Sequence, residues 1–590
     1  MLRWLLYPVI LCLAVSVQTP LSAQEQLVGH TLSFPRKHNQ YVRVSTTRPV
    51  AASHVEVSMP SWTPGSSLIR DFAADLESLS AYGPDGGSLP VRKMAKNRWR
   101  IETQGIPEVR IEYDVWAGSL GVADSWVESG IALLNGASLF LYEETTRSWA
   151  QSVDVRLPDD WSQVHSSMRR EPGTDRFLAS DYDELVDSPI VAGNTRVRDF
   201  EVNGRPYALV LSGENRLWDE QKAADDVARI VGAQQEFWGF DPFDRKYLFF
   251  NLFMGKFGGL EHDHSTVMMC SPWQMRGRGD YIKWLGLVSH EFFHSWNVRR
   301  MRPQALDEFN YDREVYTREL WLAEGLTSYY DNLLVFRSGL IDVADYFELI
   351  SEEFRVYETT PGREIRSAEL ASFDTWIKQY RQDSNKSNNS ISYYRKGAII
   401  GFVTDTAIRR ETNNKASLDD VMRAMFSRYG DRASGQRGYP PGAFESEVAA
   451  VAGPDVSKQV EEMLRSTTDP AIDEALAWYG LSLDRGQGTE AGDGANEPAP
   501  AGVGVKWDSS GRALLAAGVV QGFAGAEAGI LPGDELLAID GIRVTTDDFQ
   551  SFFQKFEPGE EVDLTLVRHG RLITLPVNLQ NEIADLYVIR

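Results

Sequence analysis

The stretch LVSHEFFHSW, residues 287–296, carries the pattern H-E-x-x-H inside an apolar run. On an α-helix His290 and His294 project from one face, one turn apart, so their imidazoles can occupy two corners of a tetrahedral Zn²⁺ site. Glu291 lies beside them and could deprotonate a water that the metal activates. The pattern is short enough to arise by chance, so the prediction of a zinc centre requires a third ligand.

The stretch LWLAEGLTSYY, residues 320–330, offers that ligand. Glu324 is its only charged residue, and a carboxylate in an apolar helix is costly to bury unless it is paired or bound to a metal. Taken alone, Glu324 could equally be a surface helix residue, but the upstream H-E-x-x-H pattern favours the ligand. We predict one Zn²⁺ per chain held by His290, His294 and Glu324, and Asp331 and Ser328 are candidates for hydrogen bonds to these ligands.

Length and composition exclude several classes of protein. A chain of 590 residues is too long for one core and predicts about three or four domains. The hydrophobic content of 43% is that of a globular protein. The formal net charge of −24, from 60 basic and 84 acidic residues, argues against nucleic acid or an anionic membrane surface as a partner.

The first 23 residues have the form of an export signal. Arg3 provides a positive start, residues 4–17 are almost continuously apolar, and residues 21–23 (LSA) form a small-residue cleavage site. The mature chain is then expected to begin at Gln24, in the periplasm or outside a bacterial cell. The alternative is an uncleaved anchor, but the apolar run is shorter than the ~20 residues of a spanning helix. No later segment is apolar enough to cross a membrane.

Removal of the signal leaves Cys270 as the only cysteine, so no intrachain disulfide is possible. We expect Cys270 to be a buried, small apolar residue.

The pattern of apolar residues predicts a multidomain α+β protein. Residues 24–197 read as an N-terminal β-sandwich-like domain, with alternating strands at 41–45, 54–59 and 109–115. Residues 198–483 read as a mixed α/β lobe followed by a helical lobe, the usual layout of a zincin catalytic domain. Residues 484–502 are rich in Gly, Ala, Pro and acid and predict a flexible linker.

Residues 503–585 are expected to form a PDZ domain. The run GAEAGILPGDELLAIDG, residues 525–541, resembles the PDZ domains of bacterial proteases over a long and specific pattern. The resemblance implies that Gly502, Val503, Gly504 and Val505 form the loop that receives a peptide carboxylate. A peptide or protein C-terminus is therefore an expected partner, bound by strand addition.

Three further segments resemble the glycyl aminopeptidase family of gluzincin zinc metallopeptidases. They are HEFFHSWNVRRMRP at 290–303, MPSWTPGS at 59–66 and YDELVDSP at 182–189, while WLAEGLTSYY is similar to the third-ligand helix of gluzincin aminopeptidases. The resemblance covers nearly the whole mature chain. It implies an N-terminal β-domain, a thermolysin-like catalytic domain and a C-terminal PDZ domain. Ser66 departs from the family, in which an aromatic residue is expected.

Two shorter motifs imply roles in substrate binding and catalysis. GGLEH, residues 258–262, is similar to the G-x-M-E-N edge strand of related aminopeptidases. It implies that Glu261 holds the substrate α-ammonium and that Gly258 and Gly259 admit the substrate backbone. His262 is expected to bind substrate or form hydrogen bonds rather than hold a second metal.

The second motif, SYYRKG at residues 392–397, resembles the Y-x-K-G segment of the same enzymes. It implies that Tyr394 donates a hydrogen bond to the developing oxyanion and that Tyr393 packs in the core.

These patterns predict a secreted zinc metallo-aminopeptidase that acts on peptides with a free N-terminus, with small N-terminal residues, Gly or Ala, preferred by resemblance. One alternative is a zinc endopeptidase that uses the same site on substrates recruited by the PDZ domain. Another is a PDZ-centred binding protein whose peptidase lobe is vestigial. Arg299, Arg300 and Arg302 are expected to fix the loop after the zinc helix, although one of them could face a substrate carboxylate.

Overall fold

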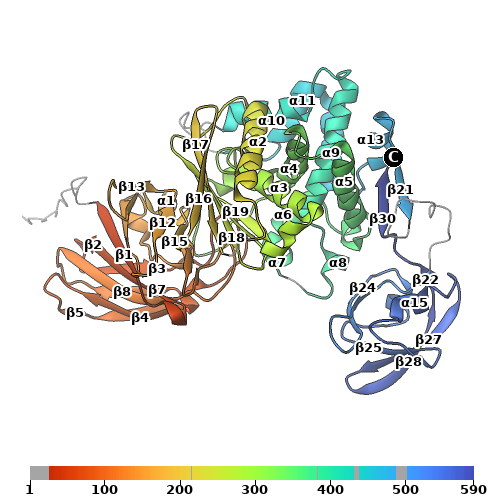
Figure 1. Cartoon of the computed structure of the whole chain (residues 1–590), viewed down its shortest axis with the longest axis horizontal. Helices are drawn as coiled ribbons and strands as arrows, with labels where there is room; N and C mark the ends of the chain where they lie inside the picture. Colours follow the sequence, from red (N-terminus) through yellow and green to blue (C-terminus); the bar gives the residue numbers. More distant parts are fainter. Residues whose placement is uncertain (1–25, 214–215, 382, 431–437, 487–500) are drawn as a thin grey trace, which may run out of the picture.

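The computed structural model describes residues 26–213, 216–381, 383–430, 438–486 and 501–590. The chain forms an N-terminal β-domain, a mixed and then helical catalytic lobe, and a small C-terminal β-domain, so the predicted multidomain α+β class is confirmed (Figure 1). The predicted export signal and most of the predicted linker lie outside the described residues. Among the described helices, none combines the length and the apolar character that a membrane crossing requires.

Strands are the main secondary structure of the N-terminal domain, which also contains the short helix α1 (Tyr182–Val186). Their bounds are β1 (Leu27–Arg36), β2 (Tyr41–Pro49), β3 (His54–Ser58), β4 (Leu76–Tyr82), β5 (Ser88–Leu89), β6 (Val91–Ala95), β7 (Arg98–Glu102), β8 (Glu108–Trp116), β9 (Trp126–Val127), β10 (Ile131–Leu134), β11 (Ala150–Arg156), β12 (Gln163–Ser166), β13 (Arg169–Arg170), β14 (Arg176–Ala179) and β15 (Ile190–Gly193). They build an eight-stranded sheet in the order β13-β14-β11-β1-β2-β8-β4-β5, and two smaller sheets, β3-β7-β6 and β12-β15-β10-β9. The strands predicted at 41–45, 54–59 and 109–115 are confirmed as β2, β3 and β8. Their alternate residues are buried because successive side chains of a strand point to opposite faces.

A five-stranded sheet carries the helix with the H-E-x-x-H pattern. Its strands are β16 (Arg196–Val202), β17 (Arg205–Ser212), β18 (Tyr247–Phe253), β19 (Gly258–Glu261) and β20 (Ser265–Cys270). The order is β16-β17-β18-β20-β19, with β17, β18 and β20 parallel and the two outer strands antiparallel. Every residue of β18 and β20 is buried, including Cys270 as expected, since parallel strands are covered on both faces. The motif strand β19 lies at the edge of the sheet.

Helices cover this sheet and continue into the helical lobe. They are α2 (Glu220–Trp238), α3 (Arg278–Phe293), α4 (Leu326–Arg337), α5 (Val343–Glu358), α6 (Ala368–Phe373), α7 (Thr375–Lys378), α8 (Lys386–Asn389), α9 (Tyr393–Glu411), α10 (Leu418–Tyr429), α11 (Ala443–Ala452), α12 (Pro454–Arg465) and α13 (Ile472–Trp478). Asp219 caps α2 by accepting from the Lys222 amide at 3.0 Å, and Gly239 ends it at a φ of 81°. A capping box formed by Ser417 and Asp420 opens α10.

The C-terminal domain has its own apolar core, separate from that of the catalytic lobe. Its elements are β22 (Ala501–Gly502), β23 (Val505–Asp508), β24 (Leu515–Val519), α14 (Ala524–Glu527), β25 (Glu535–Ile539), β26 (Ile542–Arg543), α15 (Phe549–Phe553), β27 (Glu561–Arg568), β28 (Arg571–Asn578) and β29 (Gln580–Asn581). The sheet order is β23-β24-β25-β27-β28, so β23 lies at an edge.

This domain is attached to the catalytic lobe at both of its ends. The final strand β30 (Leu586–Ile589) leaves the domain and pairs with β21 (Leu483–Gly486), which includes the first residues of the predicted linker. The Tyr587 hydroxyl donates to Glu358 of α5 at 2.9 Å. At a second contact, the Asn388 side chain donates to the Val519 carbonyl at 2.8 Å. The sequence alone did not predict this return of the chain.

Candidate metal centre and substrate cleft

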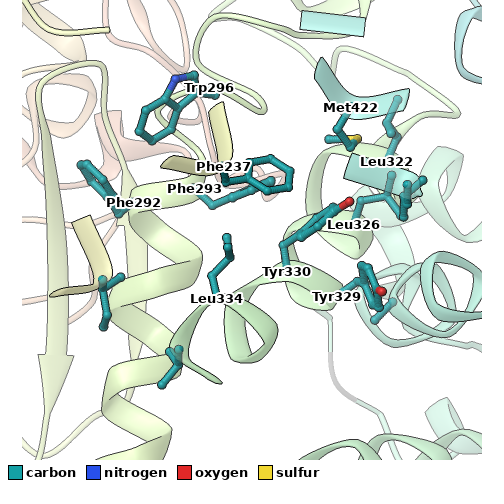
Figure 2. Close-up of a cluster of buried hydrophobic side chains, with 14 of the residues drawn as sticks. Phe237, Phe292, Phe293, Trp296, Leu322, Leu326, Tyr329, Tyr330, Leu334 and Met422 are labelled. Atoms are coloured by element: carbon teal, nitrogen blue, oxygen red, sulfur yellow. The ribbon is translucent and has the colours of Figure 1, made fainter. Parts of the chain in front are cut away.

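The H-E-x-x-H pattern occupies the last turn of α3. The His294 amide follows the end of the helix and donates to the His290 carbonyl at 3.3 Å, so the helical turn is continued. Figure 2 shows Phe293 packed beside Phe237 and Tyr330 in the core of the lobe. These buried apolar side chains fix the rotation of α3, and the two histidines project from another face of the helix.

Glu324 approaches the histidines from a separate segment. It lies in a π-helical turn, Trp321–Gly325, that leads directly into α4. Such turns are frequent at functional sites. A Cβ added at Gly325 would lie 2.6 Å from the Gly397 Cα, and one added at Gly397 would lie 2.8 Å from the Gly325 Cα. The two helices therefore touch through glycine backbone, which brings Glu324 and the start of α9 to one cleft.

Three donor atoms converge at this point. The Glu324 Oε2 lies 3.5 Å from His290 Nε2 and 3.1 Å from His294 Nε2. On the other side of each ring, His290 Nδ1 lies 3.2 Å from an Asp331 oxygen and His294 Nδ1 lies 2.8 Å from the Asn297 carbonyl. These acceptors favour the tautomer with the proton on Nδ1, which leaves both Nε2 lone pairs free for a metal.

The charges of the three donors fit a divalent cation. Burial lowers the pKa of His290, but hydrogen bonds to Asp331 and Glu324 outweigh it and raise that pKa well above its ordinary value. Burial raises the pKa of Glu324, yet the two histidines reverse the shift and hold it below the ordinary value. Positive charge is thus favoured where two nitrogens and one carboxylate oxygen meet within 4.8 Å of one another. Two histidines and one glutamate are a donor set of zinc centres.

Glu291 lies against the edge strand β19. A Cβ added at Gly259 would lie 2.2 Å from the Glu291 Oε1, so no larger residue fits opposite this carboxylate. The other oxygen, Oε2, is buried and has no hydrogen-bond partner among the described residues. Burial raises the pKa of Glu291 to about 7, although the neighbouring histidines oppose the shift. A carboxyl group with that pKa can both accept and release a proton near neutral pH.

Tyr394 faces the metal centre from the first turn of α9. Its ring is stacked on His290, with 6.1 Å between centroids, and burial keeps its pKa well above the usual range, so the hydroxyl remains a donor. The neighbouring Tyr393 is buried and its hydroxyl lies 3.0 Å from that of Thr375. The Tyr380 hydroxyl lies 2.9 Å from that of Tyr394. Tyr380 belongs to no motif, so only the tertiary fold identifies it.

Glu261 ends the edge strand and is 4% exposed. Its carboxylate has no hydrogen bond or ion pair with any residue in the described part of the chain. The N-terminal domain covers it with the MPSWTPGS loop. A Cβ added at Gly65 of this loop, where φ is +86°, would lie 2.6 Å from the Leu260 Cδ1 and 3.0 Å from the Glu261 Oε1. A glycine is required there for both its φ and its close approach.

Beyond Glu261 a set of buried ion pairs closes the cleft. Arg299 contacts Asp187 at 2.6 Å and Asp263 at 2.9 Å, and thereby fixes the loop after α3, as expected. His262 is 2% exposed and its Nδ1 lies 3.2 Å from Asp187. His262 therefore forms a hydrogen bond to the YDELVDSP segment and does not line the cleft. These contacts join the N-terminal domain to the catalytic lobe.

Two connected hollows surround the metal centre. The cleft has a volume of about 810 Å³ and is lined by Gly258, Gly259 and Glu261 together with the metal-binding residues. A side pocket of about 50 Å³ adjoins it, and Glu261, Glu324 and Tyr380 line both hollows. The other walls of the side pocket are largely apolar and include Trp62, Phe309, Trp376 and Tyr393.

The four residues Gly502 to Val505 run from the end of β22 to the start of β23. Gly504 has a φ of +64°, and a Cβ added there would lie 2.3 Å from the Phe523 Cβ. The Val503 carbonyl accepts from the Gly525 amide at 2.8 Å, and the Gly504 carbonyl accepts from the Val520 amide at 2.8 Å. The loop thus precedes the edge strand at which another strand can be added.

Three family models match the chain. The M61 glycyl aminopeptidase model matches residues 283–400, the peptidase M61 N-terminal domain matches residues 30–194, and a PDZ domain matches residues 516–568. No curated protein matches.

Solved structures give a further comparison. The aminopeptidase N family protein from Idiomarina loihiensis is 29% identical, with a TM-score of 0.90 over 95% of this chain and 98% of that chain. The M1 zinc metallopeptidase from Deinococcus radiodurans is 14% identical, with a TM-score of 0.48 over 76% of this chain and 95% of that chain. The M61 models match both the N-terminal domain and the segment with all three donor residues, so the chain is similar to the M61 glycyl aminopeptidases and is a zinc metallopeptidase of the aminopeptidase type.

Proposed function

We propose that the protein removes single small residues, Gly or Ala, from the free N-terminus of peptides. One observation carries the exopeptidase assignment. The Glu261 carboxylate is almost completely buried beside the metal centre and is unpaired among the described residues. A buried carboxylate requires a cation, and a substrate α-ammonium supplies one. That contact fixes the N-terminus one residue from the bond to be cut.

The mechanism follows from the positions of four side chains. His290, His294 and Glu324 would hold one Zn²⁺ per chain, which would supply Lewis-acid chemistry to polarise the scissile carbonyl and acidify water. Glu291 takes the proton of the attacking water and later delivers it to the leaving amine. Tyr394 donates its hydroxyl hydrogen bond to the oxygen on which negative charge develops.

The edge strand orients the substrate. An extended peptide adds to the free edge of β19, where Gly258 and Gly259 leave room for its backbone. When the substrate ammonium binds Glu261, the first peptide bond lies near Gly259, two residues back along the strand. Glu291 of α3 faces Gly259 and therefore lies opposite this bond. The side pocket of about 50 Å³ supports a preference for small N-terminal residues, since its aromatic walls leave little volume for a larger side chain.

Export and the domain arrangement belong to the same proposal. The signal at residues 1–23 directs the protein to the periplasm or the medium. The N-terminal domain then spans residues 24–197, the catalytic domain 198–483, the linker 484–502 and the PDZ domain 503–585. Gly502 to Val505 receive the C-terminus of a peptide or protein partner beside the open edge of β23.

N-terminal acetylation tests the exopeptidase assignment. We expect the zinc-loaded enzyme to cleave Gly and Ala amides with a free amine and to leave their N-acetylated forms uncut. Glu261→Gln should lower kcat/KM on the free amines by about 10–100-fold, because one charge-assisted contact is lost. Glu352→Gln is the matched control, since Glu352 lines the same cleft but is paired with Arg355. Equal cleavage of acetylated and free substrates would refute the assignment.

A methyl group at Gly259 tests the placement of Glu291. Because the new Cβ would lie 2.2 Å from the Glu291 Oε1, Gly259→Ala must displace the carboxylate or the strand. We expect kcat to fall by about 10²-fold, the cost of a small misplacement at a reacting centre. Zinc content, measured by atomic absorption, should remain at one per chain. Gly279→Ala, which meets no neighbouring atom, should be fully active, and an equally active Gly259→Ala would contradict the geometry.

A further inference from the structure

The end of the cleft opposite Glu261 has no role in the mechanism above. Along the edge-strand segment, Glu261, Gly259 and then Lys256 line the cleft in that order. Along α3, His294, His290 and then Lys283 line the same cleft. Both elements therefore lead from the buried acid, past the metal centre, to a lysine. A peptide bound with its ammonium on Glu261 has its C-terminal end directed toward these lysines.

The acidic residues at the lysine end are already paired with arginines. The pairs are Arg70–Asp124 at 3.1 Å, Arg355–Glu352 at 2.6 Å and Arg395–Glu353 at 2.7 Å. Asp331, which also lines the cleft, lies against His290. Lys256 and Lys283 also lie within electrostatic range of Asp124 and Glu352, but each of these acids already pairs with an arginine, so cationic groups are in excess at this end among the described residues.

The two lysines keep their charge available. The Lys256 ammonium donates to the Leu120 carbonyl of the N-terminal domain, an acceptor that holds it in place without neutralising it. Lys283 is exposed and has no hydrogen bond or ion pair within the described ranges. The cleft is therefore polarised, with an unpaired carboxylate at one end and an excess of positive charge, from two lysines beside acids that already pair with arginines, at the other.

We propose that Lys256 and Lys283 bind the C-terminal carboxylate of short peptides, so that the preferred substrates are tripeptides and tetrapeptides with both ends free. The inference rests on the proposed aminopeptidase function and adds its substrate class. Lys283 precedes His290 by seven residues, about 10 Å along a helix that rises 1.5 Å per residue. An extended peptide covers about 3.4 Å per residue, so this distance holds two or three residues beyond the scissile bond.

The first experiment compares free acids with amides. Steady-state kcat/KM of the zinc enzyme is measured on Ala-Ala-Ala, Ala-Ala-Ala-Ala and their C-terminal amides. We expect the acids to be cleaved about 10–100-fold faster than the amides, as for a charge-assisted contact. The advantage should shrink in high salt, since the lysines are exposed and their charges are screened. Equal rates for acids and amides would overturn the proposal while leaving the aminopeptidase function intact.

Variants assign the effect to the two lysines. Lys283→Met and Lys256→Met should each reduce kcat/KM on the acids, and the double variant should abolish the difference between acid and amide. Lys283→Arg should retain the preference, because it keeps the charge. Lys415→Met, at an exposed lysine outside the cleft, should leave all rates unchanged. An unaltered acid preference in the double variant would place the carboxylate elsewhere and refute the proposal.

Two further substrates test which carboxylate the lysines bind and whether a free N-terminus is required. An acidic side chain could offer the same carboxylate, so Ala-Ala-Glu-NH₂ is compared with Ala-Ala-Ala-NH₂. If Ala-Ala-Glu-NH₂ is cleaved as fast as the free acid Ala-Ala-Ala, the lysines bind a side-chain carboxylate as well as they bind a C-terminal one, and the proposal is overturned. Cleavage of N-acetyl-Ala-Ala-Ala would instead contradict the aminopeptidase function, so the two failures are distinguishable.

Discussion

Glu291→Gln is expected to abolish turnover while the protein keeps its zinc. The amide has the size of the carboxylate but cannot accept a proton from the attacking water or return one to the leaving amine. General acid–base catalysis contributes about 10²–10⁴-fold, and here one residue serves both steps. We therefore expect kcat to fall by at least 10³-fold, with KM little changed, because Glu291 does not contact the substrate ammonium.

The loss is measured on Gly and Ala amides, with zinc content and thermal unfolding recorded for the same samples. Glu319→Gln is the matched control. Glu319 is a half-buried glutamate, its pKa is also raised to about 7 by burial, and it lies outside the cleft. If Glu291→Gln retains turnover, or if Glu319→Gln loses as much turnover as Glu291→Gln, the assignment of Glu291 as the proton carrier is refuted.

Tyr394→Phe has the second largest expected effect. Loss of one hydrogen-bond donor to a developing oxyanion lowers kcat by about 10²–10³-fold. KM should change little, because the contact strengthens only as negative charge develops on the substrate oxygen. The ring of Tyr394 stacks on His290 and Phe keeps that stacking, so zinc binding should be retained.

The adjacent tyrosine supplies the control. Tyr393→Phe removes the hydroxyl of the preceding residue, which lies against Thr375. It should leave kcat within a few-fold of the wild type. Tyr380→Phe is informative as well, because its hydroxyl contacts that of Tyr394. A rate loss in Tyr380→Phe as large as in Tyr394→Phe, with Tyr394→Phe retaining most activity, would transfer the donor role to Tyr380.

Much of the molecule could be predicted from local patterns. Alternating apolar residues predicted β2, β3 and β8, and the helix caps at Asp219 and Ser417 likewise depend only on residues close in the chain. These signals act between residues that are near each other in the chain, so they are present in the sequence itself. The same holds for His290 and His294, which need only one helical turn to share a face.

Other features depend on contacts between distant segments. The 3.1 Å approach of Glu324 to His294 requires Gly325 and Gly397 to touch. The apolar periodicity of a helix does not predict which other helix will pack against it. Gly65 of the N-terminal domain covers Glu261 of the edge strand. Tyr380 reaches Tyr394 from a segment that carries no motif, and β30 returns from the last residues of the chain to pair with β21.

Spacings of a few residues were enough to predict the zinc-binding residue types, the order of the domains and the glycine-rich edge strand. Three other features depend on the tertiary structure: the convergence of the donor oxygens and nitrogens, the burial of Glu261 without a partner among the described residues, and the hydrogen bond of His262 to Asp187 outside the cleft. The physical reason is that burial and charge pairing are set by what packs against a residue, and in this protein those neighbours come from other domains and distant helices.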